Sequence, residues 1–250
     1  MNTLPTSDNL RIEKLTAIFG STTTSYKYLW FLAILESLKN PSNLEIISFN
    51  SLIIKIIVRA WFPINVYRLS FGKQDSLTKH IKALILENPI LANCQKEELE
   101  KWLFAHLDDK TVKQIFNELL QYVPYRFLSV FFAEKLVGMA DIEKNNAIVK
   151  YAEIDFFNSE NLPIYKFSTD KKALILHPLW HQYFQKHLVI LSDFCKWNLL
   201  LYLQKNNPNV PNISGKLAPE TTRDLKNGKL FWKNVFLQQP DFQCIYSQKT

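Results

Sequence analysis

Apolar residues recur at intervals of three and four positions along most of this chain, which is the spacing of a helix face and not of a strand. The clearest case is Thr24–Leu38, where apolar side chains fall on one side of a helix that begins among serines and threonines and ends at Asn40-Pro41. The same spacing predicts further helices over 9–19, 49–61, 76–87, 96–107, 111–123 and 141–157, with Pro63, Pro89 and Pro124 as stop signals. The fold class is therefore predicted to be mainly α, as an irregular multi-helix array.

The longest helix is predicted near residues 178–205, because Pro178 suits a first helical turn and the apolar spacing continues up to Asn206. Before it, short apolar runs between 163 and 176 allow at most a small hairpin. After it, prolines and a glycine among asparagines make 206–219 a turn-rich connector, which is followed by a helix over about 221–238. The predicted organisation is a helical domain over 1–205, the connector 206–219 and a separate segment 220–250.

Composition supports a packed globular protein. The chain has 250 residues, of which 47% are hydrophobic, and only five glycines, so it lacks the signature of disorder. No apolar stretch approaches the roughly 18 to 20 residues that a transmembrane helix needs, and the N-terminus does not resemble a secretory signal. We therefore expect a cytoplasmic protein without a membrane partner, whose three widely spaced cysteines, Cys94, Cys195 and Cys244, are reduced thiols.

Motifs for catalysis or cofactor binding are not evident. The chain has no glycine-rich phosphate loop, no dinucleotide fingerprint and no nucleophile elbow, so we predict no cofactor. His177 and His181 have the four-residue spacing of a metal pair, but Pro178 places His177 before the helix, and no glutamate supplies a general base. We assign no catalytic residue and no metal ligand, and keep an enzyme built on these two histidines and nearby carboxylates only as a third possibility.

The net charge of +7 and the sequence pI near 9.1 favour a polyanionic partner. Basic residues are denser toward the C-terminus, where the candidate DNA contacts are Lys205, Lys216, Arg223, Lys226, Lys229 and Lys233. Aromatic and basic residues also alternate over 61–73, 122–128 and 231–233. Such segments either stack on bases and hold phosphates, or place their rings in the core beneath basic side chains. The second interpretation is the commoner one.

Five strings of this chain resemble the N-terminal region of a bacterial HNH endonuclease family. They are residues 21–32 (STTTSYKYLWFL), 60–65 (AWFPIN), 69–77 (LSFGKQDSL), 123–129 (VPYRFLS) and 206–213 (NNPNVPNI). The similarity extends over most of residues 15–247. It implies a helical region that leads into a C-terminal nuclease module, whose first strand resembles Phe242–Lys249.

In that family pattern the Asp-His pair, the later Asn and the second His lie beyond Thr250, so no residue here inherits a catalytic role. The resemblance thus implies that this chain is the N-terminal portion of a DNA endonuclease and is inactive alone. The intact protein would use a divalent cation such as Mg²⁺. Cys244 and Ser247 stand where related modules carry a Cys-x-x-Cys zinc knuckle, and the serine argues against bound zinc. The alternative is a helical protein-interaction or regulatory module without catalytic activity. The sequence predicts neither the oligomeric state nor the DNA sequence recognised.

Overall fold

The computed structural model describes residues 4–20, 22–39, 45–157 and 161–217, together with Leu230, Phe231 and Asn234. The chain divides into two compact units, residues 1–217 and 218–250. Apart from the three residues just named, the predicted helix over 221–238 lies outside the described part of the chain. Within that part the fold is mainly helical with a small sheet, so the predicted fold class is confirmed.

The α-helices are α1 (Ile12–Ala17), α2 (Tyr26–Ser37), α3 (Phe49–Asn65), α4 (Leu77–Glu87), α5 (Lys96–Ala105), α6 (Lys110–Leu128), α7 (Asp141–Ile154), α8 (Pro178–Lys186), α9 (Leu188–Asn206) and α10 (Ile213–Leu217). Two 3₁₀ helices, η1 (Pro89–Asn93) and η2 (Ser129–Leu136), and three strands, β1 (Ile46–Ser48), β2 (Tyr165–Phe167) and β3 (Ala173–Leu176), complete the elements. Among the residues described, none of these helices combines the length and the apolar character needed to cross a bilayer.

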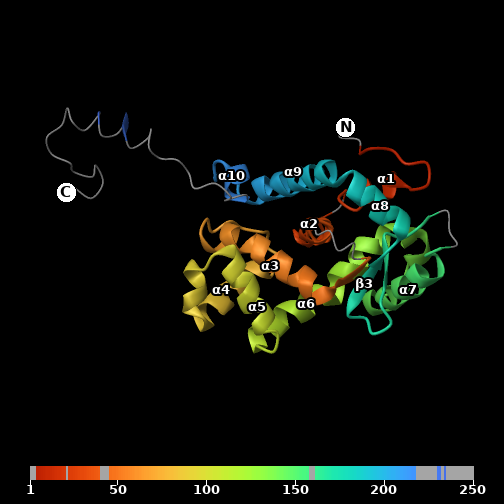
Figure 1. The fold of residues 1–250 in the computed structure, drawn as a ribbon, viewed down its shortest axis with the longest axis horizontal. Helices are drawn as coiled ribbons and strands as arrows, with labels where there is room; N and C mark the ends of the chain where they lie inside the picture. Colours follow the sequence, from red (N-terminus) through yellow and green to blue (C-terminus); the bar gives the residue numbers. More distant parts are fainter. Residues whose placement is uncertain are drawn as a thin grey trace. The chain divides into compact units, whose positions relative to one another are not determined.

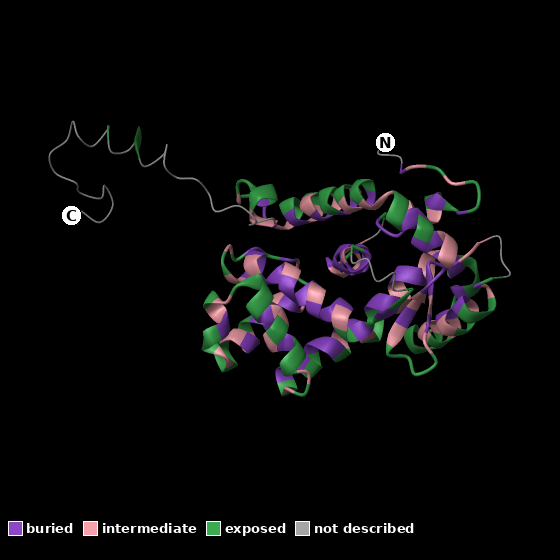
Figure 2. Cartoon of the chain, in the orientation of Figure 1, coloured by how far each residue is buried: buried purple, intermediate pink, exposed green. Residues whose placement is uncertain are grey.

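Helix α2 forms the centre of the first unit (Figure 1). It contacts α3, α6 and α9, which lie on different sides of it. The sequence pattern predicts one apolar side, but Trp30, Ala33 and Ile34 are as fully buried as Phe31 and Leu35. A helix that is apolar all round is a helix enclosed by others, and Figure 2 shows the buried colour around α2.

The predicted hairpin over 163–176 is present as β2 and β3, and it gains a third strand. The strand order is β1-β3-β2, with both pairs antiparallel, and Ile46 lies opposite Ile175. β1 was not predicted, because three residues next to a helix start are too few for a period of two to be visible. Through the pairing of β1 with β3, the sheet joins residues 46–48 to residues 173–175.

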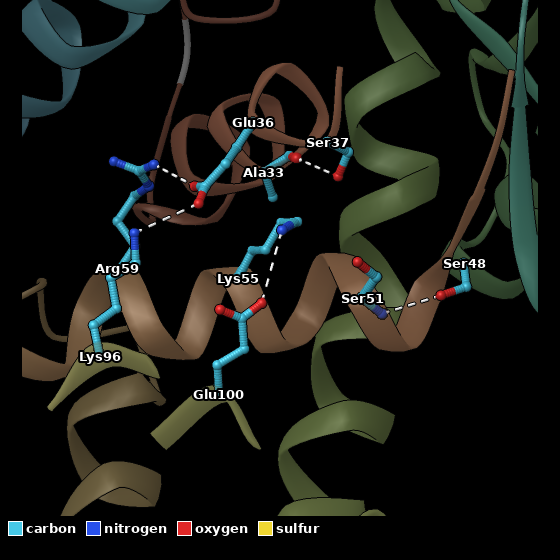
Figure 3. Close-up of polar contacts among 9 residues, drawn as sticks. All are labelled: Ala33, Glu36, Ser37, Ser48, Ser51, Lys55, Arg59, Lys96 and Glu100. Atoms are coloured by element: carbon cyan, nitrogen blue, oxygen red, sulfur yellow. Dashed lines mark hydrogen bonds and ion pairs between the residues drawn. The ribbon is translucent and has the colours of Figure 1, made fainter. Parts of the chain in front are cut away.

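Charged side chains connect α2 to α3 and α5 at the edge of this core (Figure 3). The Arg59 guanidinium lies 2.6 Å from one carboxylate oxygen of Glu36, and Lys96 Nζ lies 3.6 Å from the other. Burial alone raises the pKa of Glu36, but the attraction of Arg59, Lys96 and Lys55 outweighs it, so that this pKa is lowered. The carboxylate form of Glu36 therefore stabilises the contact between the three helices.

Two prolines do not end their helices as the sequence predicts. Pro63 lies inside α3, which continues to Asn65, and Pro124 lies inside α6, which continues to Leu128. A proline in a helix costs about 3 kcal/mol because one backbone hydrogen bond is lost. Phe127 and Leu128, which follow Pro124, are fully buried, and burial of their side chains offsets that cost.

The long helix predicted near 178–205 consists of two helices, α8 and α9, separated at His187. The backbone of His187 has φ −114° and ψ 22°, which is outside the helical region. Further along, α10 lies within the segment predicted as a connector, and it contacts both α3 and α9. Residues 206–217 therefore pack as part of the first unit.

Candidate nucleic-acid interface

The loop between α3 and α4, residues 66–76, has no regular secondary structure, yet it is fixed by contacts with α9. The Asn207 side chain accepts a hydrogen bond from Ser70 N and donates one to Ser70 O, both at 2.8 Å. It also donates to Leu203 O, one turn back in α9. In addition, the Tyr202 hydroxyl donates to Phe71 O at 2.6 Å. The Tyr202 hydroxyl also lies 3.2 Å from Thr23 O, and Leu69 N donates to Pro63 O. Four of the strings named above, 21–32, 60–65, 69–77 and 206–213, therefore meet at one place.

The other side of this loop is held by the start of α2. Asp75 is buried, and one of its carboxylate oxygens accepts hydrogen bonds from Ser25 N at 3.1 Å and from Ser25 Oγ at 2.6 Å. The second oxygen accepts from Leu77 N at the start of α4. Burial raises the pKa of Asp75 to about 6, against the lowering effect of these hydrogen bonds.

We expect the stability of the protein to depend on pH through Asp75. The unfolded carboxyl ionises near its ordinary pKa of 3.8, whereas the folded one ionises at about 6. Between these values the unfolded state loses the proton first, so the free energy of unfolding falls as the pH rises, by about 3 kcal/mol for a shift of this size. Asp75→Asn removes the titration. The advantage of the wild type over this variant should therefore shrink by about that amount from pH 3 to pH 7 in urea denaturation.

Glu36→Gln is the matched comparison, because the pKa of Glu36 is lowered and its effect has the opposite sign. Its contribution to stability is present above its unfolded pKa and is lost as the pH falls through the folded pKa. The advantage of the wild type over Glu36→Gln should therefore shrink on acidification. A difference between wild type and Asp75→Asn that stays constant over the same pH range would contradict the role given to Asp75.

A second polar cluster adjoins Asp75 and contains a serine, a histidine and a glutamate, but not in the arrangement of a catalytic triad. Ser76 Oγ and His80 Nε2 both bond to the same oxygen of Glu118, at 2.7 Å and 2.6 Å. A triad requires the histidine to lie between the serine and the carboxylate. Here the carboxylate lies between the other two, so the histidine does not contact the serine, and the cluster connects α4 to α6 as a structural contact.

Four cationic side chains belong to the segments that meet at this loop: Arg68, Lys73, Lys205 and Lys216. The first three are exposed, and the Lys216 ammonium lies 6.0 Å from the ring centre of Tyr67. The two stretches that carry them, 55–74 and 194–217, contain no aspartate or glutamate. We call these four residues the basic face; their positive charges are suited to phosphate groups.

Of the six DNA contacts predicted from the sequence, only Lys205 and Lys216 lie in the described part of the chain, and both belong to the basic face. Arg223, Lys226, Lys229 and Lys233 lie outside the described residues. Arg68 and Lys73 were not among the six, although they occur in the aromatic and basic segment 61–73. In that segment Trp61 and Phe71 are buried, so these rings belong to the core and do not stack on bases.

His177 and His181, the two histidines with the spacing of a metal pair, lie at the N-cap and within the helix of α8. His177 Nδ1 accepts a hydrogen bond from Leu179 N at the start of α8, and burial lowers the pKa of His177. His181 is buried in α8. Among the residues described, no three histidine, cysteine, aspartate or glutamate side chains are grouped closely enough to hold a metal ion. Cys94 and Cys195 are free thiols, as predicted, and Cys244 lies outside the described residues.

Comparisons of the chain with protein-family models, with curated proteins and with solved structures give no match.

Proposed function

We propose that this chain is the helical DNA-binding portion of an HNH-type endonuclease and that the basic face contacts the DNA backbone. The observation that carries the proposal is the gathering of Arg68, Lys73, Lys205 and Lys216 around a loop, residues 66–76, whose one acidic residue, Asp75, is buried. The resemblance of residues 15–247 to an HNH family is consistent with it. Arg223, Lys226, Lys229 and Lys233 follow α10 in the sequence and add to the net positive charge of the chain.

We assign no catalytic role in DNA hydrolysis to residues 1–250. The chemistry requires a histidine base and a divalent cation close to the scissile phosphate. In the family pattern the histidine base and the residues that bind the cation follow position 250. The described residues offer no group of three metal ligands. We therefore expect the 250-residue chain to bind DNA and, with Mg²⁺ present, to leave a supercoiled plasmid uncut.

The test of DNA binding is its dependence on salt. Four phosphate contacts give a slope of log affinity against log salt of about −3.6, which is a loss of about 150-fold between 50 and 200 mM salt. Replacing Arg68, Lys73, Lys205 and Lys216 together by glutamine should remove most of this slope and lower the affinity about 100-fold at 50 mM salt. Fluorescence anisotropy with a labelled 20-base-pair duplex measures both quantities.

The control is a variant with the same change in net charge at exposed lysines elsewhere: Lys82, Lys101, Lys150 and Lys186, all replaced by glutamine. It should keep the wild-type slope. A third variant, with Lys226, Lys229 and Lys233 replaced by glutamine, tests whether the C-terminal lysines add contacts, and it should lower the affinity equally for unrelated sequences. Equal losses in the basic-face variant and the control, or no salt slope in the wild type, would overturn the proposal.

A second candidate is a helical protein-interaction module without catalytic activity. One observation favours it: α9 exposes several large apolar side chains on its outer side. An apolar interface responds little to salt, whereas phosphate contacts respond steeply, so the same titrations separate the two functions.

A further inference from the structure

The middle of the loop between α3 and α4 is held by one side chain at the end of α9. Residues 66–76 have no regular secondary structure apart from the start of α4 that follows them, so contacts with other elements determine their position. Asn207, directly after α9, is buried, and its amide bonds to both polar groups of the Ser70 backbone at 2.8 Å. Ser70 therefore cannot move away from α9 without losing both hydrogen bonds.

The cations of the basic face lie on both sides of this contact in the sequence. Arg68 and Lys73 are two and three residues from Ser70, and at about 3.6 Å per residue their Cα atoms lie within about 11 Å of the Ser70 Cα atom. On the other segment, Lys205 precedes Asn207 by two residues. Asn207 thus joins the half of the basic face on the loop to the half on α9 and α10.

Arg68 has a backbone conformation that is unusual for an arginine. Its φ is +53°, in the left-handed region that favours glycine, and it lies in the turn that Leu69 N closes by donating to Pro63 O at 2.9 Å. A side chain with a Cβ atom costs stability at such a position. The guanidinium forms no ion pair with another described residue, so it is available to an external anion.

We propose, on the basis of the DNA binding proposed above, that Asn207 is a positioning residue of the basic face. Its two bonds to Ser70 hold the loop where Arg68 and Lys73 reach the same DNA backbone as Lys205 and Lys216. Without these bonds the two loop cations would have to be ordered at each binding event, which costs the free energy that their phosphate contacts supply. The number of phosphates contacted would then fall from four to two.

The first experiment needs no DNA. Amide hydrogen exchange of peptides over 66–76, measured by mass spectrometry, should be about tenfold faster in Asn207→Ala than in the wild type. Asn198→Ala is the matched control: Asn198 lies in α9 and, like Asn207, donates to the carbonyl four residues earlier, but it bonds to no other element. It should leave the exchange of the loop unchanged. Equal exchange in the wild type and Asn207→Ala would overturn the positioning role.

The second experiment measures how salt affects binding to the labelled 20-base-pair duplex. The slope of log affinity against log salt should change from about −3.6 in the wild type and Asn198→Ala to about −1.8 in Asn207→Ala, with an affinity about tenfold lower at 50 mM salt. Partial unfolding of a variant lowers the concentration of binding-competent protein but does not change the number of phosphates contacted. The slope therefore separates positioning from a loss of stability.

Combined variants identify which cations lose their contacts. Arg68→Gln with Lys73→Gln should reduce the slope by about 1.8 in the wild type and change nothing further in Asn207→Ala. Lys205→Gln with Lys216→Gln should remove the slope that remains in Asn207→Ala. If Asn207→Ala keeps the wild-type slope, the positioning role is overturned and DNA binding stands. A wild type without a salt slope would overturn both.

Arg68→Gly provides a test in which stability and binding move in opposite directions. The variant should raise the Tm, because glycine adopts φ +53° without strain. It should also reduce the salt slope by about 0.9, because one phosphate contact is lost. A loss of stability cannot produce that combination. An unchanged slope would show that Arg68 contacts no phosphate and would overturn the role given to the loop.

Discussion

Gly72→Ala is expected to lower the free energy of unfolding by about 4 kcal/mol, because two separate costs coincide at this position. Gly72 has φ +105°, a conformation that residues with a Cβ atom rarely adopt. A Cβ atom there would also lie 2.5 Å from the Tyr202 hydroxyl, which donates to Phe71 O. The loop would have to move away from α9. Urea denaturation followed by circular dichroism measures the loss.

Gly138→Ala is the matched control, since Gly138 also has a positive φ, +79°, but has no atom within 4 Å of the added Cβ. It should cost only about 1 kcal/mol, the strain of the backbone alone. Combining Gly72→Ala with Tyr202→Phe removes the atom that the new methyl group meets. The double variant should therefore be more stable than the sum of the two single effects predicts. Equal losses for Gly72→Ala and Gly138→Ala would show that contact with Tyr202 contributes nothing.

Tyr165→Phe is expected to cost about 2 kcal/mol, although only one oxygen atom is removed. The Tyr165 hydroxyl is fully buried; it accepts a hydrogen bond from Trp30 Nε1 at 3.2 Å and donates one to Pro124 O at 2.6 Å. Without it, the Trp30 N–H has no partner in the core, whereas the Pro124 carbonyl lies inside α6 and keeps its helical hydrogen bond. One buried group left without a partner costs about 2 kcal/mol. Thermal denaturation measures the decrease in Tm.

Tyr122→Phe is the control for this variant. Tyr122 lies on α6, as Pro124 does, but it is 43% exposed, so loss of its hydroxyl leaves no buried group without a partner. Its stability should match that of the wild type. If Tyr165→Phe were equally stable, the hydrogen bonds from α2 to β2 and α6 through this hydroxyl would not contribute to stability.

The spacing of apolar residues predicted the helices well, because a helix with one buried side has an apolar residue at every third or fourth position. It failed where tertiary contacts outweighed local preference. Pro124 is a strong local stop signal, but the buried residues after it keep α6 helical. The break at His187 is not visible in the sequence pattern, since a single non-helical residue hardly shifts the apolar spacing of α8 and α9. β1 depends on a partner strand more than 120 residues away in the sequence, which no local pattern reveals.

The candidate interface could be predicted only in part. Lys205 and Lys216 were found from charge density, and the segment around Arg68 and Lys73 was noticed for its mixture of rings and cations. That these segments meet follows from Asn207 and Tyr202, whose hydrogen bonds to residues 70 and 71 are invisible in a sequence. The burial of Asp75, and therefore its raised pKa, also requires the three-dimensional arrangement.

The central position of α2 determines the order in which a newly made chain can fold. About 150 residues separate the end of α2 at Ser37 from the start of α9 at Leu188, and at roughly 5 to 20 residues per second the ribosome needs about 8 to 30 s to add them. During that time the side of α2 that α9 later covers remains open to water. This interval is long compared with the formation of a helix, so a nascent chain carries an apolar helix that chaperones can bind. Slower translation between the two helices would lengthen that exposure and increase aggregation.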